Sequence, residues 1–220
     1  MLQLLNIVNS LHKRTKRDFI GRMTDSKIEC MKIAKRFDKD FWDGDRRHGY
    51  GGFRYDGRWE AVARQLIEKY NLPKNAKILD VGCGKGFVLY ELKKILPDCE
   101  IVGFDISQYA LDNAKEEVKG VLYNHAAQNP YPYKDKEFDL VFSINTLHNL
   151  LLFDFVSALK EIQRVGKEKY IAVEAYRNEE ELFNLQCWVL TGQCFMKPEE
   201  WIWLFKEYKY TGDYEFIYFE

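Results

Sequence analysis

Short apolar runs alternate with amphipathic stretches along the last two thirds of the chain. Apolar runs of strand length lie at 77–82, 100–105, 120–125, 138–143 and 169–175, and residues 214–219 alternate between apolar and polar side chains. Between these runs, apolar residues recur with helical spacing at 86–95, 108–118, 152–165 and 198–207. Strands that alternate with helices in this way predict an α/β fold with a parallel sheet.

The first third of the chain has a different pattern. Residues 1–37 are predicted to be helical, and their basic cluster at 12–17 is either a solvated helix face or a docking surface for an anionic partner. Residues 41–59 hold five glycines, which prevent a regular helix. We therefore expect an N-terminal helical extension with a glycine- and arginine-rich lid at 1–60, and a core at 61–220 with a helical insertion at 179–195.

Composition narrows the class of protein. A chain of 220 residues can bury a core without disulfide bonds, and a formal net charge of −1 demands no polyanionic partner. The five cysteines are scattered, with no C-x-x-C pair and no histidine at metal-ligand spacing, so we expect reduced thiols, no metal site and a cytoplasmic protein. The first eight residues are too short and too polar for a membrane-spanning helix. Composition leaves the oligomeric state open between monomer and homodimer.

The most specific signal is a glycine turn between the first apolar run and the next helix. Gly82, Gly84 and Gly86 follow Asp80 at alternate positions. A phosphate-binding loop requires G-x-x-x-x-G-K-[ST] and a dinucleotide site requires G-x-G-x-x-G, and this spacing fits neither. An acid before the turn would repel a pyrophosphate, so it favours a ligand with a cationic end.

The series Asp80-x-Gly82-x-Gly84-x-Gly86 resembles the first motif of class I S-adenosylmethionine-dependent methyltransferases. The resemblance implies a Rossmann-like, doubly wound, mostly parallel sheet of six to seven strands with helices on both faces. It also implies that S-adenosylmethionine is the cofactor and that it lies against Asp80, Gly82, Cys83, Gly84 and Gly86. The family usually ends with two strands after the last helix, whereas residues 209–219 leave room for one full strand.

The same resemblance assigns the cofactor's nucleoside. Asp105, at the end of the second strand, would accept hydrogen bonds from the ribose hydroxyls, which are strong when the acceptor is ionised. Ile106 would pack on the adenine face. The family often has an acid after the third strand, but Ala127 stands there in this chain, so Gln128 is the nearest side chain that could accept from the adenine amino group.

The loops after the fourth and fifth strands border the methyl acceptor in this family. The resemblance places Asn145 beside the cofactor, and His148 is the candidate general base because its pKa normally lies near neutrality. The alternative is that His148 only makes a hydrogen bond at a helix start. Glu174 and Tyr176 would face the same pocket, where Glu174 either binds a substrate hydroxyl or pairs with Arg177.

The lid contains both arginines and acids. We expect Tyr50 and the turn at 51–52 to close over the cofactor, and Arg46 or Arg54 to reach an anionic group of the substrate, because a guanidinium suits carboxylate and phosphate. The alternative is a connecting loop whose arginines pair with Asp43, Asp45 and Asp56.

These features favour a small-molecule O- or N-methyltransferase. Segments 43–59, 173–178 and 201–219 are similar to a group of small bacterial methyltransferases that accompany surface-polysaccharide biosynthesis, which suggests a sugar, nucleotide-sugar or anionic capsule precursor. One alternative is an RNA or protein methyltransferase, which the near-neutral charge and the lack of a separate RNA-binding module disfavour. The other is a non-catalytic cofactor-binding subunit of another methyltransferase.

Overall fold

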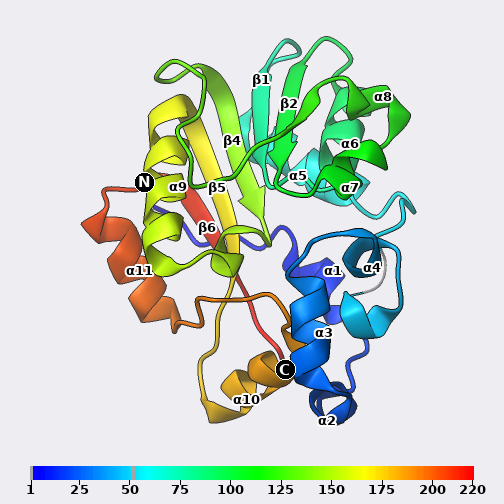
Figure 1. The fold of residues 1–220 in the computed structure, drawn as a ribbon. Coiled ribbons are helices and arrows are strands. Elements are labelled where there is room, and N and C mark those ends of the chain that lie inside the picture. The colour runs from blue at the N-terminus through cyan, green and yellow to red at the C-terminus, as the bar shows by residue number, and fades with distance from the viewer. Residues whose placement is uncertain (1, 51–52) are drawn as a thin grey trace.

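The computed structural model describes residues 2–50 and 53–220, and its centre is one parallel sheet (Figure 1). Six strands lie in the order β3-β2-β1-β4-β5-β6, and every neighbouring pair is parallel. The strands are β1 (Lys77–Val81), β2 (Glu100–Asp105), β3 (Leu122–Asn124), β4 (Phe138–Ile144), β5 (Gly166–Glu174) and β6 (Asp213–Ile217). The predicted Rossmann-like α/β fold is confirmed.

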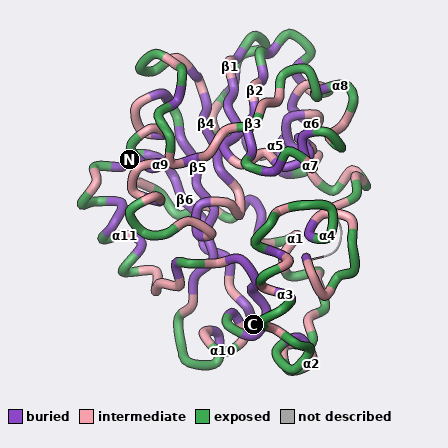
Figure 2. The backbone as a smooth tube through the Cα atoms, in the orientation of Figure 1, coloured by how far each residue is buried: buried purple, intermediate pink, exposed green. Residues whose placement is uncertain are grey.

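Helices cover both faces of the sheet because alternate strand residues point to opposite sides. Ile78 belongs to the core under α5 (Glu60–Tyr70) and α6 (Phe87–Ile95), whereas Leu79 belongs to the core under α9 (Leu152–Val165) and α11 (Pro198–Glu207). Buried residues accordingly follow the strands, while exposed residues lie on the outer turns (Figure 2). No described helix has the length and apolarity that crossing a membrane requires.

One predicted helix differs from the structure. The helix expected at 108–118 is divided into α7 (Gln108–Asp112) and α8 (Glu116–Lys119), because the chain leaves helical geometry at Asn113 and Lys115 donates its N–H to the Lys85 carbonyl. The sheet ends with β6 alone, as the short C-terminal segment predicts. On the outer side of β6, Leu4 forms a parallel bridge with Tyr214, so the N-terminal chain pairs with this edge.

A buried carboxylate fixes this N-terminal chain. Glu215 on β6 has no exposed surface, and its oxygens accept from the backbone N–H groups of Ile7, Val8 and Asn9 at 2.5–3.1 Å. Tyr170 donates its hydroxyl to the same carboxylate at 2.6 Å. Hydrogen bonds to an ionised acceptor are the stronger kind, so we call Glu215 and its three backbone donors the N-terminal latch.

The rest of the N-terminal region forms short helices at the carboxyl ends of the strands (Figure 1). They are α1 (Asn9–Lys13), α2 (Phe19–Thr24), α3 (Lys27–Ala34), α4 (Lys39–Trp42) and the 3₁₀ turn η1 (Arg46–His48). The predicted helical character of 1–37 is therefore present, but with breaks between helices. The insertion after β5 forms α10 (Glu179–Trp188), which packs against α2.

Candidate functional site

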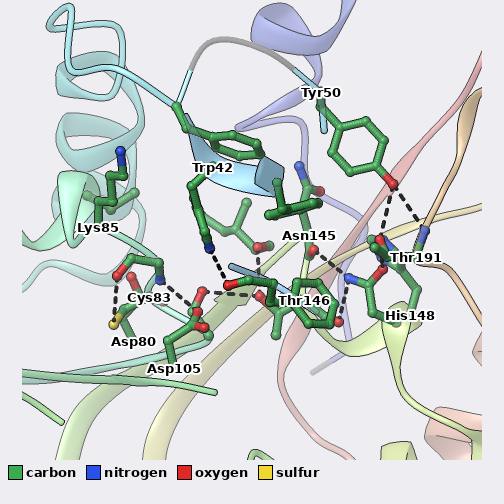
Figure 3. A pocket seen from close by; sticks show the side chains of 18 of the residues that line it. Trp42, Tyr50, Asp80, Cys83, Lys85, Asp105, Asn145, Thr146, His148 and Thr191 are labelled. Atoms are coloured by element: carbon green, nitrogen blue, oxygen red, sulfur yellow. Dashed lines mark hydrogen bonds between the residues drawn. The ribbon is translucent and has the colours of Figure 1, made fainter. Parts of the chain in front are cut away.

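A cavity of about 360 Å³ lies where β1, β2, β4 and β5 end, and it has two halves (Figure 3). The glycine-turn half is lined by Asp80, Gly82, Cys83, Gly84, Asp105, Ile106, His125 and Gln128. The His148 half is lined by His12, Arg17, Tyr50, His148, Glu174, Trp188, Thr191 and Phe219. Asn145 and Thr146, in the loop after β4, lie between them (Figure 3).

The glycine turn brings main chain to the cavity wall. Gly82 and Gly84 have φ angles of +79° and +54°, a region that side chains disfavour. A Cβ on Gly82 would lie 2.2 Å from Thr146, and one on Gly84 would lie 2.8 Å from Trp42. Gly86 is not among the residues that line the cavity; it precedes α6 and its missing Cβ makes room for Val118.

Two buried carboxyl groups flank the turn. Asp105 accepts from Gly84 N–H at 2.9 Å and from Ser107 N–H at 2.8 Å, which orients both of its oxygens. Burial raises the pKa of Asp105 despite these bonds. Burial, followed by the charge of Asp105, raises the pKa of Asp80 well above its usual range. A cationic ligand would stabilise the ionised form of both groups.

Polar atoms without a protein partner lie at the far end of this half. Gln128 Oε1 and His125 Nε2 are buried and have no hydrogen-bond partner among the described residues. Buried polar atoms are normally paired, so such atoms on a cavity wall are suited to a polar ligand. Ile106 is 56% exposed beside them and offers an apolar face, while Ala127 has no polar group there.

The N-terminal region covers the glycine turn through α4 and the residues around it. Trp42 donates its indole N–H to Ser107 Oγ at 2.8 Å, next to Gly84 (Figure 3). Lys85 contacts Asp43 at 2.6 Å, and Tyr109 donates to Asp43 at 2.9 Å. These bonds lower the pKa of Asp43 although its burial opposes them. Asp43 thus joins this region to the glycine turn through Lys85, and Trp42 joins it to the loop after β2 through Ser107.

Tyr50 lines the cavity in the His148 half. Its hydroxyl accepts from Leu190 N–H at 2.9 Å and lies 3.1 Å from Thr191 Oγ1, which in turn donates to Asn149 at 2.7 Å (Figure 3). Burial raises the pKa of Tyr50 to about 12. These hydrogen bonds join the lid, the insertion after β5 and the loop after β4. The turn at 51–52, which we expected over the cofactor, lies outside the described residues.

His148 and Glu174 form a buried pair. His148 Nε2 lies 3.4 Å from Glu174 Oε2, and the Glu174 backbone N–H points at His148 Nδ1 from 3.4 Å. A backbone donor at Nδ1 places the imidazole proton on Nε2, facing the carboxyl group. Burial lowers the pKa of His148 to about 3 and raises that of Glu174 to about 8, with Arg17 opposing the second shift. At neutral pH His148 is therefore mostly neutral and Glu174 is mostly protonated, so neither member of the pair carries much charge.

His12 connects this half to the loop after β4. Its Nε2 lies 2.8 Å from the Asn145 amide, and its Nδ1 lies 3.1 Å from an Arg17 Nη2. Burial, followed by the charge of Arg17, lowers the pKa of His12 to about 3. Both partner atoms are N–H donors, Asn145 Nδ2 and Arg17 Nη2, and a neutral imidazole has one acceptor nitrogen, so His12 accepts a hydrogen bond from only one of them. Asn145 has the left-handed φ of +57°, a strained geometry that Asn tolerates better than most residues.

Three residues expected to bind the substrate do not line the cavity in the described structure: Arg46, Arg54 and Tyr176. Arg46 instead donates to the Lys16 carbonyl at 2.8 Å. Arg54 is exposed, and Arg177 pairs with Glu181 and Glu220 rather than with Glu174. The cavity arginine in the His148 half is Arg17, which lies in the basic cluster that the sequence left between a solvated face and a docking surface.

Sequence reasoning also missed His12, His125 and Trp42. His12 and Arg17 belong to a basic run that looks like many solvated helix faces, and nothing local marks them as facing a cavity. His125 directly follows β3, and ligands bind at the carboxyl ends of parallel strands, so this position could have marked His125 as a site residue. The described residues contain no cluster of three or more metal-ligating side chains.

Comparison with known proteins connects this arrangement to a family. A family model described as a methyltransferase domain matches residues 72–209. The chain is 29% identical over 140 residues to the human mitochondrial arginine-hydroxylase NDUFAF5, which covers 61% of this chain and 39% of that protein. It is 28% identical over 156 residues to demethylmenaquinone methyltransferase of Bacillus licheniformis, which covers 68% of this chain and 64% of that enzyme. The chain thus spans less than two thirds of the length of either relative.

Solved structures agree on the fold. A chain in the complex between the Haloferax volcanii Trm112 methyltransferase activator and a methyltransferase superposes with a TM-score of 0.53 at 17% identity. The superposition covers 70% of this chain and 77% of that one. At this identity the likeness concerns the fold alone.

Proposed function

The chain belongs to the methyltransferase-domain family of class I S-adenosylmethionine-dependent enzymes, and from that premise we propose that it methylates a small anionic acceptor. The two halves of the cavity support this proposal. One half has the chemistry to hold a cationic nucleoside, and the other has groups that can bind an acceptor and take up its proton. Proximity and orientation in such a cavity can lower a barrier by ~7–11 kcal/mol.

The residues of the glycine-turn half fit S-adenosylmethionine. Asp105 keeps lone pairs for two ribose hydroxyls while Gly84 and Ser107 hold it in place. Gln128 Oε1 lacks a described partner and can accept from the adenine amino group, beside Ile106. Asp80 is suited to the ammonium group, and Gly82 and Gly84 let the ligand lie on the main chain. When bound, the cofactor supplies an electrophilic methyl group on a cationic sulfur atom.

The His148 half supplies proton chemistry. Glu174 Oε2 is buried without a described partner other than the nearby His148 ring. An ionised carboxylate with a raised pKa is a stronger base than an ordinary one, so Glu174 is the proton acceptor in our proposal. His148 Nε2 lies 3.4 Å from Glu174 Oε2, and His148 is the positioning residue in our proposal.

The enclosure of the cavity supports a small acceptor. Tyr50, Thr191 and Asn149 close the His148 half by hydrogen bonds between three separate segments. The proposal includes a sugar or nucleotide-sugar as the acceptor. It also includes a cytoplasmic setting, because five unpaired cysteines fit a reducing compartment. A macromolecular acceptor is the competing proposal.

The observation that carries the proposal is that Asp105, oriented by Gly84 N–H, and Glu174, beside His148, line one cavity. The test is to incubate the purified protein with methyl-labelled S-adenosylmethionine and, separately, a small-molecule and a macromolecular cell extract. We expect label in the small-molecule extract, in a product heavier than its precursor by one methylene unit.

Two outcomes would contradict the proposal. Label confined to the macromolecular extract would indicate an RNA or protein acceptor. Bound cofactor with no labelled product in either extract would indicate a non-catalytic subunit.

A further inference from the structure

Arg17 is a cation without a counter-ion on the wall of the cavity. It makes no ion pair with any described Asp or Glu, whereas Arg164 pairs with Glu161 and Arg177 pairs with Glu181. Its Nε atom is buried and has no hydrogen-bond partner among the described residues. Partly buried charges are costly unless they are paired, so this position favours an anion from outside the chain.

Arg22 shows what a satisfied buried arginine looks like in the same region. Its guanidinium donates to three backbone carbonyls, those of Trp188, Arg46 and Gly49. Arg17 has one carbonyl, that of Thr15 at 3.3 Å, and the imidazole of His12 at 3.1 Å. Arg17 therefore has fewer acceptors within the described protein than Arg22 has.

The surroundings hold Arg17 in this position. Its guanidinium lies 4.9 Å from the Phe219 ring centre and 5.7 Å from that of Trp188, within the range of cation–π attraction. His12 is itself held by Asn145 at 2.8 Å. A guanidinium fixed by two rings and an imidazole is pre-organised, so little side-chain entropy is lost when an oxyanion binds.

Arg17 and Glu174 line the same cavity, and they form no ion pair in the described structure. The space between a guanidinium and a carboxyl group in one cavity can hold a molecule with an oxyanion at one end and a proton donor at the other.

The charged side chains of the His148 half favour a neutral proton donor. Arg17 and Glu174 are the charged side chains of this half, whereas Asp80 and Asp105 line the glycine-turn half, where we place the cationic cofactor. An oxyanion would pair with Arg17 and a neutral hydroxyl would lie at Glu174, whereas an ammonium group would add a cation beside Arg17.

We propose that the methyl acceptor is a small hydroxyl compound that carries a carboxylate or phosphate group, with the oxyanion on Arg17 and the hydroxyl at Glu174. This inference rests on the proposed methyl transfer and names the substrate class and the residue that selects it. The hydroxyl oxygen forms the new bond to the methyl carbon, the carbon–sulfur bond breaks with its electron pair left on sulfur, and the hydroxyl proton passes to the Glu174 carboxylate. The oxyanion is unchanged, so the product stays an anion.

The test uses the labelled small-molecule product. The full-length protein is incubated with methyl-labelled S-adenosylmethionine and a small-molecule extract, and the product is applied to an anion exchanger. We expect the label to be retained, and phosphatase treatment then separates the two sources: it releases a phosphate ester from the exchanger but leaves a carboxylate bound.

Variants connect the anion to Arg17. Arg17→Gln should raise KM for the partly purified acceptor roughly 10- to 100-fold, which corresponds to the loss of one or two charge-assisted hydrogen bonds. Arg17→Lys should recover part of this loss because it restores the charge without the planar fork. Arg47→Gln is the matched control, since Arg47 lies on the same N-terminal region but pairs with Asp25 at its half-exposed surface. Calorimetric affinity for S-adenosylmethionine should be the same in all four proteins.

Labelled product in the unretained fraction would overturn the inference and leave methyl transfer intact. An unchanged KM in Arg17→Gln would do the same. The absence of label from every fraction would contradict the proposed function itself, and with it the inference that depends on it.

Discussion

The two halves of the cavity are built from the chain in different ways. The glycine-turn half comes mainly from lining residues within 80–85 and from Asp105 and Ile106, which one strand–turn–helix–strand unit brings together. The His148 half takes His12, Tyr50, His148, Glu174 and Thr191 from five separate segments. The first half depends on local sequence, whereas the second depends on how distant segments pack. In our proposal the first half is the cofactor site, which many relatives can share, and the second is the acceptor site, which is free to differ.

The halves also differ in what stabilises them. Asp105 is fixed by backbone N–H groups next to it in the fold, so its geometry is retained wherever the turn forms. His12 and Arg17 instead follow the N-terminal latch, which ties the chain to β6 through Glu215. Substitutions of Asp105, Glu174 and Glu215 should therefore affect three different properties: cofactor affinity, turnover and the order of the N-terminal region.

The largest effect should come from Glu174→Gln, which should lower turnover. Loss of the proton acceptor should lower turnover by about 10²-fold or more, because general base catalysis typically contributes 10²–10⁴-fold. Single-turnover rates at saturating cofactor would measure it, with the exposed Glu179→Gln as a control. A Glu174→Gln protein with the turnover of the control would remove Glu174 from the reaction.

Glu215→Gln should release the N-terminal latch. The amide offers one acceptor oxygen where the carboxylate serves three backbone donors and Tyr170, so unfolding free energy should fall by about 2–3 kcal/mol. Urea unfolding measures the loss, and trypsin should cleave near Arg14 faster. Glu207→Gln, at an exposed position on α11, is the control. If both variants unfold alike, the latch does not hold the N-terminal region.

Asp105→Ala should weaken S-adenosylmethionine binding by roughly 1.5–3 kcal/mol, through the loss of hydrogen bonds to a charged acceptor. Isothermal titration calorimetry gives the affinity, and exposed Asp112→Ala serves for comparison. Equal affinities in the two variants would show that Asp105 has no role in cofactor binding.

The remaining comparison is a pH dependence of the His148 half, which needs no substitution. Glu174 faces His148 and Arg17, with Tyr50 nearby, and burial raises its pKa from 4.5 to about 8. Turnover should therefore rise with pH through this range, by up to about tenfold per unit, as the ionised base is populated. A flat profile between pH 6 and 8 would contradict the assignment.

The free energy of unfolding should fall as the pH rises, whereas turnover should increase. The folded protein retains the Glu174 proton that an unfolded chain releases above about pH 4.5, so this contribution is full below that pH and is lost as pH rises through about 8. Thermal unfolding at pH 6 and pH 9 measures the change. Between pH 6 and pH 9, the Glu174→Gln protein should lose less stability than the unchanged protein loses.

The same division explains how much could be read from the sequence. Strand and helix periodicity located the sheet, and α9 and α11 begin and end where the pattern predicts. Tyr50 was expected in the site, and it lines the cavity in the His148 half. Arg17 could not be distinguished from solvent-facing neighbours such as Lys16, because its burial depends on Trp188 and Phe219, which lie 171 and 202 residues further along the chain.

Separation of the two halves is the central claim, and one set of calorimetric titrations tests it most directly. S-adenosylmethionine is titrated into the unchanged protein, Asp105→Ala, Glu174→Gln and the double variant. We expect Glu174→Gln to bind like the unchanged protein and the double variant to bind like Asp105→Ala, because distant, independent sites have additive effects. Equal loss of affinity in both single variants, or in neither, would contradict the account.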